Sequence, residues 1–362
     1  MASIVGKKRG EATYYYLVES ARVGGKPRIV SQEYLGTAEE LAAAMRGGGL
    51  GLPDRIQHKD FGAVAVAWGL LEDLGVAAII DEAAGARRAD AGASVGTYLV
   101  LAALNRLADP CSKRGLADWW ARTAAPRFTK IPASVLDHRR FWDAMHAVPL
   151  EALEEISRRI AVRIAGELGL DCSSVALDMT NFATFIDTGN GKAPIAQRGK
   201  AKQKRSDLRL VGLGLVVTRD GGIPLAWRAY PGDRPDVTQF PALIGQLRAS
   251  HQAICAAAGH QPAPEMTVVF DAGQNSGDNF AYLAGTGLHY IGSVPASDCA
   301  DLTALPASAR TVVDQHRFGG LTAAGTRREV YGAERRAILT HSPGLHQGGA
   351  VEPAGLRLVE PG

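Results

Sequence analysis

Two short apolar runs, far apart in the sequence, each end in an aspartate. The first run covers residues 174–177 and is followed by Asp178, and the second covers residues 266–270 and is followed by Asp271. Apolar runs of this length fit buried central strands, which are covered on both faces. A carboxylate that closes a buried strand needs a partner or a metal ion, because an unpaired buried charge is costly. The pattern therefore predicts an α/β fold with an acidic site at one edge of a sheet.

If the two strands are parallel neighbours, Asp178 and Asp271 lie at the same edge of the sheet. Two carboxylates that close repel each other unless a cation lies between them. Mg²⁺ is the expected ion, since it binds one or two carboxylates together with phosphate oxygens and water. Two such ions, about 3.5–4 Å apart, can support phosphodiester cleavage. The alternative is that either aspartate only caps a loop or a helix.

A strongly basic segment lies between the two acidic strands. Residues 192–209 hold seven basic residues against Asp207, a net charge of +6, whereas the whole chain has a net charge of only +3. Concentrated positive charge of this kind is typical of a polyanion site, and it would bind phosphates without reading base sequence. The alternative is a solvated, disordered connection. The predicted DNA contacts are Lys192, Arg198, Lys200, Lys202, Lys204, Arg205 and Arg209.

The N-terminal part of the chain divides into a hairpin region and a helical region. Aromatic and β-branched residues on both sides of Gly24-Gly25 predict a β-hairpin over 13–35, within an N-terminal region of residues 1–50. Its basic residues are diluted by Glu11, Glu19 and Glu33, so a solvated surface is favoured over a DNA contact. The region 60–168 is expected to be all-α and is a candidate DNA-binding domain. Helical spacing predicts helices over 61–74, 95–107, 139–148 and 150–168, with a further one from Ser112 through Trp119 and Trp120.

The second half of the chain is strand-rich. Runs 210–218 and 223–230 flank Asp220-Gly221, which predicts a tight hairpin, and a helix over 238–250 follows. Ser276 is expected to cap a short helix, and residues 288–294 form a further strand. This order suits a mixed sheet with helices on its faces over 172–343. Residues 344–362 are rich in Gly and Pro and predict an irregular tail.

Tryptophan and cysteine positions add smaller expectations. We expect Trp119, Trp120 and Trp142 to pack in the helical core, whereas Lys113, Arg114, Arg139 and Arg140 form an exposed charged face or, less favoured, contact phosphates. The four cysteines are widely spaced with no CxxC pair, which argues against a thiolate zinc site and a disulfide scaffold. The sequence has no apolar signal core and no run near the roughly 20 apolar residues of a membrane span. These features predict a soluble, cytoplasmic protein.

Several segments together resemble DDE-type insertion-sequence transposases, in the IS-four-like group. The most specific are Asp178-Met179-Thr180-Asn181-Phe182 and the hairpin Thr218-Arg219-Asp220-Gly221-Gly222-Ile223-Pro224-Leu225. The remaining matching segments are 196–200, 204–208, 230–233, 271–273 and, upstream, 104–106, 109–110 and 112–113.

The resemblance implies a ribonuclease-H-like catalytic domain with flanking helices, at 172–343. It also implies a divalent-metal site with Mg²⁺ or Mn²⁺, in which Asp178 and Asp271 occupy the positions of the first two catalytic acids. The expected activity is DNA cleavage and strand transfer in cut-and-paste transposition, by a homodimer bound to element ends and target DNA.

The family's third acid is a glutamate on a later helix, in a Tyr-Arg-Glu-Lys arrangement that this sequence lacks. Glu329 and Glu334 stand in a segment where the order differs, and Glu352 and Glu360 belong to the expected tail. The sequence therefore predicts a catalytic domain that ends before its third acid. Three functions stay open: a transposase, a catalytically inactive DNA-binding remnant, and a stand-alone nuclease that would use Glu329 or Glu334.

Overall fold

The computed structural model describes residues 2–46, 58–86, 89–200, 207–259, 266–295 and 299–342, together with the backbone of residues 356–359. The chain forms two compact units, Met1–Asp60 and Phe61–Gly362. Each unit is described separately below.

The N-terminal unit is a three-stranded antiparallel sheet followed by a helix. Strands β1 (Ala2–Arg9), β2 (Ala12–Val23) and β3 (Lys26–Thr37) pair in the order β1-β2-β3, and α1 (Ala38–Arg46) follows directly. Gly24 and Gly25 join β2 to β3 with φ angles of 61° and 80°, a conformation that glycine adopts without steric cost. The expected hairpin is thus present as β2 and β3, and β1 and α1 add to it.

The second unit begins with a helical region whose elements follow the expected runs. Two short helices, α3 and α6, were not expected, and Gly75 (φ 66°) separates α3 from α2. The helix expected from Ser112 begins later, because Gly115 rather than Ser112 occupies the N-cap. The helices are α2 (Gly62–Asp73), α3 (Val76–Ala83), α4 (Val95–Ala108), α5 (Leu116–Arg122), α6 (Ala125–Thr129), α7 (His138–Ala147) and α8 (Ala152–Leu168), with a 3₁₀ turn, η1 (Ala133–Val135).

Two of the three expected core tryptophans are buried. Trp119 and Trp120 are 1% and 0% exposed, and Trp120 Nε1 donates to the carbonyl of Ile131 at 2.9 Å. The prediction for Trp142 is wrong, because this side chain is 57% exposed. The buried face of α7 carries Phe141 and Ala144, three residues apart, and Trp142, the residue after Phe141, points away from this face.

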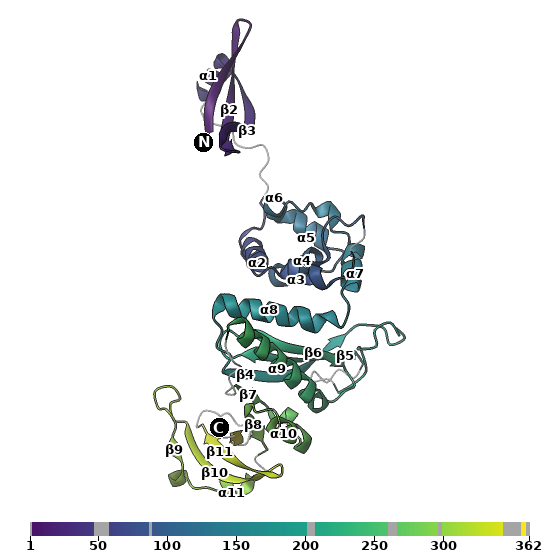
Figure 1. Cartoon of the computed structure of the whole chain (residues 1–362), viewed down its shortest axis with the longest axis vertical. Helices are drawn as coiled ribbons and strands as arrows, with labels where there is room; N and C mark the ends of the chain where they lie inside the picture. Colours follow the sequence, from purple (N-terminus) through teal and green to yellow (C-terminus); the bar gives the residue numbers. More distant parts are fainter. Residues whose placement is uncertain are drawn as a thin grey trace. The chain divides into compact units, whose positions relative to one another are not determined.

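The rest of the second unit is built on a mixed sheet with flanking helices (Figure 1). Its first five strands lie in the order β6-β5-β4-β7-β8, in which β4 is antiparallel to β5 and parallel to β7. This arrangement is compatible with the ribonuclease-H-like fold. The elements are β4 (Ser174–Thr184), β5 (Arg209–Thr218), β6 (Pro224–Pro231), η2 (Asp236–Gln239), α9 (Phe240–Ala257), β7 (Thr267–Phe270), η3 (Ala272–Gln274), α10 (Gly277–Ala284) and β8 (His289–Val294).

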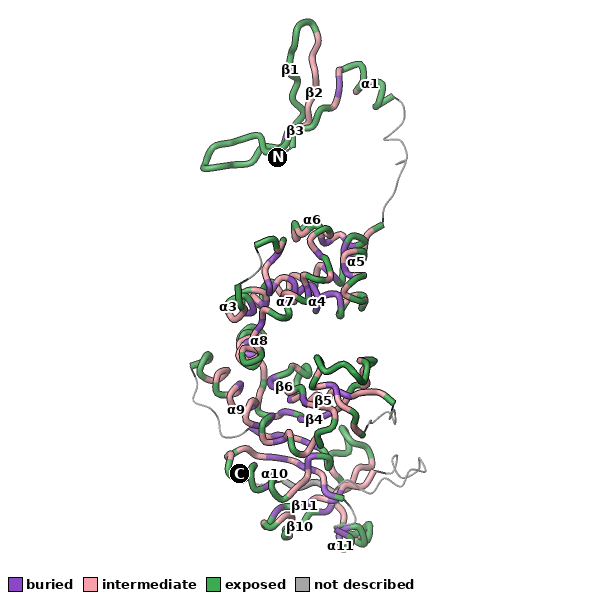
Figure 2. Tube along the Cα trace, turned by 90° about the vertical axis from the view of Figure 1, so that its right-hand side faces the viewer, coloured by how far each residue is buried: buried purple, intermediate pink, exposed green. Residues whose placement is uncertain are grey.

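Helix α8 connects the helical region to the sheet. It contacts α3 on one side and α9 and β6 on the other. Its Ile156 belongs to the hydrophobic core of the helical region, whereas its Ala161 belongs to the core of the sheet. Figure 2 shows buried stretches running through α4 and the strands β4 and β5, whereas the N-terminal strands are mostly exposed. The second unit therefore contains two cores that share one helix.

Additional strands extend the sheet beyond β8, in a part of the chain where the sequence signals for strands and helices are weak. The chain continues through α11 (Ala300–Thr303), η5 (Ala307–Ala309), β9 (Thr311–Val312), β10 (Thr322–Val330) and β11 (Ala333–His341). Residues 356–359 form β12 (Leu356–Val359), which pairs with both β8 and β11. The expectation of an irregular tail is therefore wrong for these four residues, because backbone pairing with two distant strands orders them. The rest of 344–362 lies outside the described residues.

His251 on α9 makes the stability of the fold depend on pH. Burial lowers the pKa of this histidine below its ordinary 6.5, and its Nε2 lies 3.5 Å from Cys255 Sγ. The unfolded chain therefore binds a proton at this histidine more readily than the folded chain does. The contribution of neutral His251 to the free energy of unfolding is intact above about pH 6.5 and is lost as the pH falls below that value.

We expect the melting temperature of the wild-type chain to fall more steeply from pH 7 to pH 5 than that of His251→Gln, as followed by differential scanning fluorimetry. The comparison at pH 8, where both side chains are neutral, gives the baseline for the substitution itself. Parallel curves for the two chains would contradict the assignment.

Candidate functional site

The two aspartates follow hydrogen-bonded neighbours in parallel strands. Leu177 of β4 lies opposite Phe270 of β7, so that Asp178 and Asp271 each come one residue after this pair. Both strands run in the same direction, so both aspartates lie at the level where β7 ends, although β4 itself continues to Thr184. Both side chains are exposed. Two residues that are distant in the sequence are thus placed on adjacent strands.

Backbone amides hold one oxygen of each carboxylate. Asp178 Oδ1 accepts from the amide of Met179 at 2.7 Å, and Asp271 Oδ1 accepts from the amide of Gly273 at 3.0 Å. The second contact makes Asp271 the N-cap of η3. Asp271 therefore caps a short helix, as the alternative interpretation holds. Its carboxylate nevertheless remains accessible to solvent. These bonds orient the two carboxylates.

A buried tyrosine beside Asp178 was missed from the sequence. Tyr230 is 2% exposed, and its hydroxyl donates to Asp236 Oδ1 at 2.6 Å. Burial raises the pKa of Tyr230 above its usual range, and the hydrogen bond to Asp236 and the charges of Asp236 and Asp178 raise it further. Tyr230 is therefore a neutral donor whose hydroxyl is bonded to Asp236. A Cβ on Gly212 would lie 2.1 Å from the Tyr230 ring, so the glycine leaves room for this side chain.

Asn279 joins the segment that carries Asp236 to the segment that follows Asp271. This side chain is 4% exposed, and its Nδ2 donates to the carbonyls of Val237 at 3.0 Å and Gln274 at 2.8 Å. Asn279 lies on α10, and Ser276 caps this helix as expected: its Oγ accepts from the amide of Asn279 at 3.1 Å. The loops at this edge of the sheet are thus held together by a buried amide.

The basic segment is partly folded against the sheet. Gln197 exchanges backbone hydrogen bonds with Leu210 of β5 at 3.0 and 2.7 Å, and Ala196 is fully buried. A Cβ on Gly199 would lie 2.0 Å from the carbonyl oxygen of Gly232, so the backbones approach closely here. The expectation of a disordered connection is therefore wrong for residues 192–200. Lys202, Lys204 and Arg205 lie outside the described residues.

The four described basic residues of this segment differ in their surroundings. Lys192, Arg198 and Lys200 are exposed. Arg209 instead donates to the carbonyls of Asp187 at 3.3 Å and Asn190 at 2.9 Å, which stabilises the turn before the segment. The backbone of Lys200 accepts from Asn181 Nδ2 of β4 at 3.2 Å. Three cations therefore remain accessible, on a backbone that is bonded to the strand of Asp178.

The acids considered for the third catalytic position lie on a different hairpin. Glu329 of β10 and Glu334 of β11 are cross-strand neighbours, and Glu334 lies 3.6 Å from Arg327. In the described ranges, no three His, Cys, Asp or Glu side chains gather closely enough to hold a metal ion. Glu352 and Glu360 lie outside those ranges. The candidate site thus consists of Asp178 and Asp271, with Asp236 nearby.

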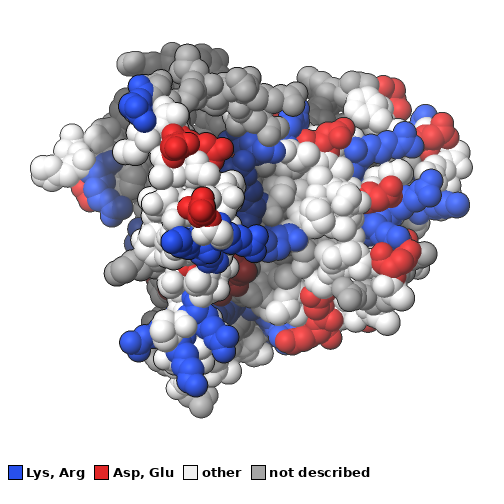
Figure 3. Space-filling model, turned by 90° about the horizontal axis from the view of Figure 1, so that it is seen from above, with Lys and Arg blue, Asp and Glu red and all other residues white. Residues whose placement is uncertain are grey.

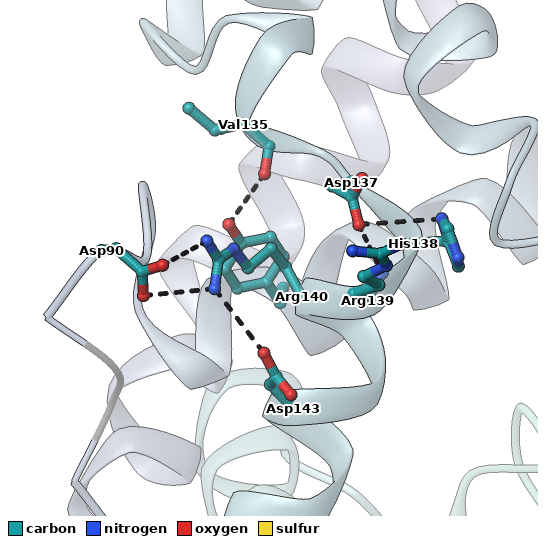
Figure 4. A network of polar contacts seen from close by, with 8 residues as sticks. Asp90, Val135, Asp137, His138, Arg139, Arg140 and Asp143 are labelled. Atoms are coloured by element: carbon teal, nitrogen blue, oxygen red, sulfur yellow. Dashed lines mark hydrogen bonds and ion pairs between the residues drawn. The ribbon is translucent and has the colours of Figure 1, made fainter.

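The basic residues of the helical region are partly engaged in ion pairs (Figure 4). Arg140 donates to both carboxylate oxygens of Asp90 at 3.2 and 2.6 Å, and it lies 3.7 Å from Asp143. Asp137 caps α7 by accepting from the amide of Arg139 at 2.8 Å. Arg140 therefore ties α7 to the segment before α4. On the face drawn in Figure 3, basic and acidic side chains are interspersed.

Comparisons with known proteins give only weak structural similarity. No protein-family model and no curated protein matches the chain. The solved structure "Mos1 transposase paired-end complex with left transposon end" aligns over 70% of this chain and 71% of that chain, with 11% sequence identity and a TM-score of 0.23. This similarity is too low to establish a shared fold.

The described helices were also tested as membrane spans. None of them alone is long and apolar enough to cross a membrane, although α2 and α3, bent by 53° at their break, satisfy length and composition as a pair. All four cysteines are free thiols.

Proposed function

We propose that this chain is a DDE-type transposase by descent, in the IS-four-like group, that acts on DNA in the cytoplasm. The observation that carries the proposal is the placement of Asp178 and Asp271 on adjacent parallel strands of the sheet. The order β6-β5-β4-β7-β8 and the accessible cations beside β4 support it. We further propose that the chain works as a homodimer on element ends and target DNA.

The donor set at the sheet edge fits a hard divalent cation. Two accessible carboxylates, each oriented by a backbone amide, are the ligands that Mg²⁺ prefers, with phosphate and water completing its shell. Asp178 and Asp271 would hold Mg²⁺ or Mn²⁺, and a bound ion would supply activation of water and charge stabilisation for phosphodiester cleavage. The two carboxylates of the described site suit one ion, and a second ion would need a further ligand.

The protein's own groups would position the DNA. Lys192, Arg198 and Lys200 are exposed beside the strand of Asp178, so they would contact backbone phosphates in a sequence-independent and salt-dependent manner. Tyr230, held by Asp236, would keep its proton at neutral pH because its pKa is raised. It would therefore hold Asp236 in place by its hydrogen bond and would not act as a base.

A second candidate function is a catalytically inactive DNA-binding remnant. The cross-strand pairing of Glu329 with Glu334 and the contact of Glu334 with Arg327 favour it, because they place the considered third acids on a hairpin and not on a helix beside Asp178. Such a protein would bind element ends without cutting them.

The experiment combines binding and cleavage on one DNA. A labelled duplex that contains the DNA flanking the coding sequence is incubated with the full chain in Mg²⁺ or Mn²⁺, and binding is followed by fluorescence anisotropy over a salt series. Cleavage that Asp178→Asn and Asp271→Asn both abolish supports the transposase. Asp220→Asn, which changes an exposed aspartate in the turn between β5 and β6, is the matched control and should cut normally.

Salt-sensitive binding without cleavage by any of these chains supports the remnant. Cleavage that survives both substitutions at the candidate site overturns the assignment of the two acids. Absence of binding at low salt overturns both functions.

A further inference from the structure

The N-terminal sheet carries a cluster of three tyrosines on one face. Tyr16 lies opposite Tyr34 in the pairing of β2 with β3, and Tyr14 lies two residues before Tyr16, on the same face of β2. The ring centroids of Tyr16 and Tyr34 are 5.4 Å apart, and those of Tyr14 and Tyr34 are 6.2 Å apart. These contacts confirm that the three rings share one face. The Tyr34 side chain is 53% exposed.

A lysine lies over this cluster. Lys7 of β1 pairs with Tyr14, and its ammonium lies 4.9 Å from the centroid of the Tyr16 ring. The same ammonium donates to Gln32 Oε1 of β3 at 2.8 Å. Arg9 follows two residues later on β1 and so belongs to the same face by strand alternation. The tyrosine face is defined here as Lys7, Arg9, Tyr14, Tyr16, Gln32 and Tyr34.

The sheet separates its charges between its two faces. Glu19 and Glu33 are one residue out of phase with Tyr16 and Tyr34, so the strand alternation places them on the opposite face. Leu17 lies directly opposite Glu33 on that second face. Glu19 and Glu33, which dilute the charge along the sequence, therefore do not dilute it on the tyrosine face. There the strands contribute Lys7 and Arg9.

We propose that the tyrosine face binds single-stranded nucleic acid. Exposed aromatic rings on a sheet stack unpaired bases, and adjacent cations contact the phosphates between them. Tyr34 offers the most accessible ring, and Tyr14 and Tyr16 of the neighbouring strand β2 extend the aromatic surface beside it. The inference rests on the N-terminal unit alone and does not depend on the roles of Asp178 and Asp271.

The alternative occupant is a second copy of the chain, packed against the same apolar surface. The pairing of aromatic rings with Lys7 and Arg9 favours a polyanion, because a second copy of the same face would bring like charges together. The two occupants give different results in the experiment below.

The experiment separates base stacking from phosphate binding. The full chain is titrated into a fluorescein-labelled oligothymidylate of about fifteen nucleotides and into an abasic oligonucleotide of the same length, which has the same phosphates. Wild-type chain should bind the first more tightly. Tyr34→Leu should lower affinity for oligothymidylate about tenfold and bring it close to that of the abasic strand. Tyr34→Phe, which keeps the ring, should retain most of the preference.

Tyr15→Leu is the matched control, since Tyr15 is a partly buried tyrosine on the opposite face of β2 and its loss should leave the preference intact. An oligouridylate of the same length distinguishes DNA from RNA as the preferred strand. Equal affinity of the wild-type chain for oligothymidylate and the abasic strand would overturn the proposal. So would a Tyr34→Leu chain with unchanged base preference and an altered sedimentation coefficient, which would identify the face as a contact between copies.

Discussion

Gly96→Val is expected to unfold the helical region at much lower denaturant than the wild-type chain. A Cβ at Gly96 would lie 2.0 Å from the carbonyl oxygen of Ala77 and 2.7 Å from its carbonyl carbon, and both are backbone atoms of α3. The amide of Gly96 also donates to Asp81 Oδ1 at 2.7 Å, which fixes α4 against α3 at this point. Because neither backbone can move away without losing this packing, we expect a loss of about 3 kcal/mol in the free energy of unfolding.

Urea unfolding followed by circular dichroism measures this loss, and Gly69→Ala is the matched control. Gly69 lies inside α2, and a Cβ there would have no heavy atom within 4 Å. Its replacement should stabilise the chain by up to about 1 kcal/mol, because alanine favours the helix more than glycine does. An unchanged midpoint for Gly96→Val would show that α3 and α4 do not approach so closely.

Asp178→Asn and Asp271→Asn are each expected to weaken Mn²⁺ binding by at least about 100-fold. Replacement of residues that only support a metal ligand already costs 10- to 100-fold in affinity, so removal of one of two carboxylate ligands costs at least as much. Isothermal titration with Mn²⁺ in the absence of DNA gives the affinity directly, and it does so whether or not the chain cleaves DNA.

Glu334→Gln serves as the control for this titration. Glu334 of β11 lies beside Arg327 of β10, and replacement of Glu334 should leave Mn²⁺ affinity unchanged. A loss of affinity equal to that of Asp178→Asn would instead place Glu334 at the metal and would revive the stand-alone nuclease. Affinity that is independent of both aspartates would remove the metal site from the sheet edge.

Local patterns in the sequence were sufficient to locate the apolar strand segments before Asp178 and Asp271, but the prediction that the first strand ends at Asp178 is wrong, because β4 continues to Thr184. Each run is short, apolar and closed by a carboxylate, and these properties are local. The pairing of Tyr230 with Asp236 could not be anticipated in the same way, because a buried hydroxyl chooses its acceptor only after β6 and η2 are packed. The segment 230–233, which resembles the transposase family, includes Tyr230 but ends three residues before Asp236. The resemblance therefore points to the tyrosine and not to its hydrogen-bond partner.

Other failures have the same physical origin. Strand β12 forms because backbone groups of β8 and β11 are available on either side of it, and neither strand is near it in the sequence. Trp142 is exposed because the core-facing stripe of α7 is narrow. The dilution of positive charge by Glu19 and Glu33 was inferred from a linear count, whereas the alternation of the strands separates these residues from Lys7.

The shared helix α8 restricts how the second unit can receive a rigid ligand. Ile156 and Ala161 are only five positions apart on one continuous helix, and each is packed into a different core. A hinge between the helical region and the sheet would have to break this helix or empty one of the two cores. A duplex that touches both regions must therefore adapt its own curvature to the protein, so that sites with easily bent base steps would be preferred even where no side chain reads a base.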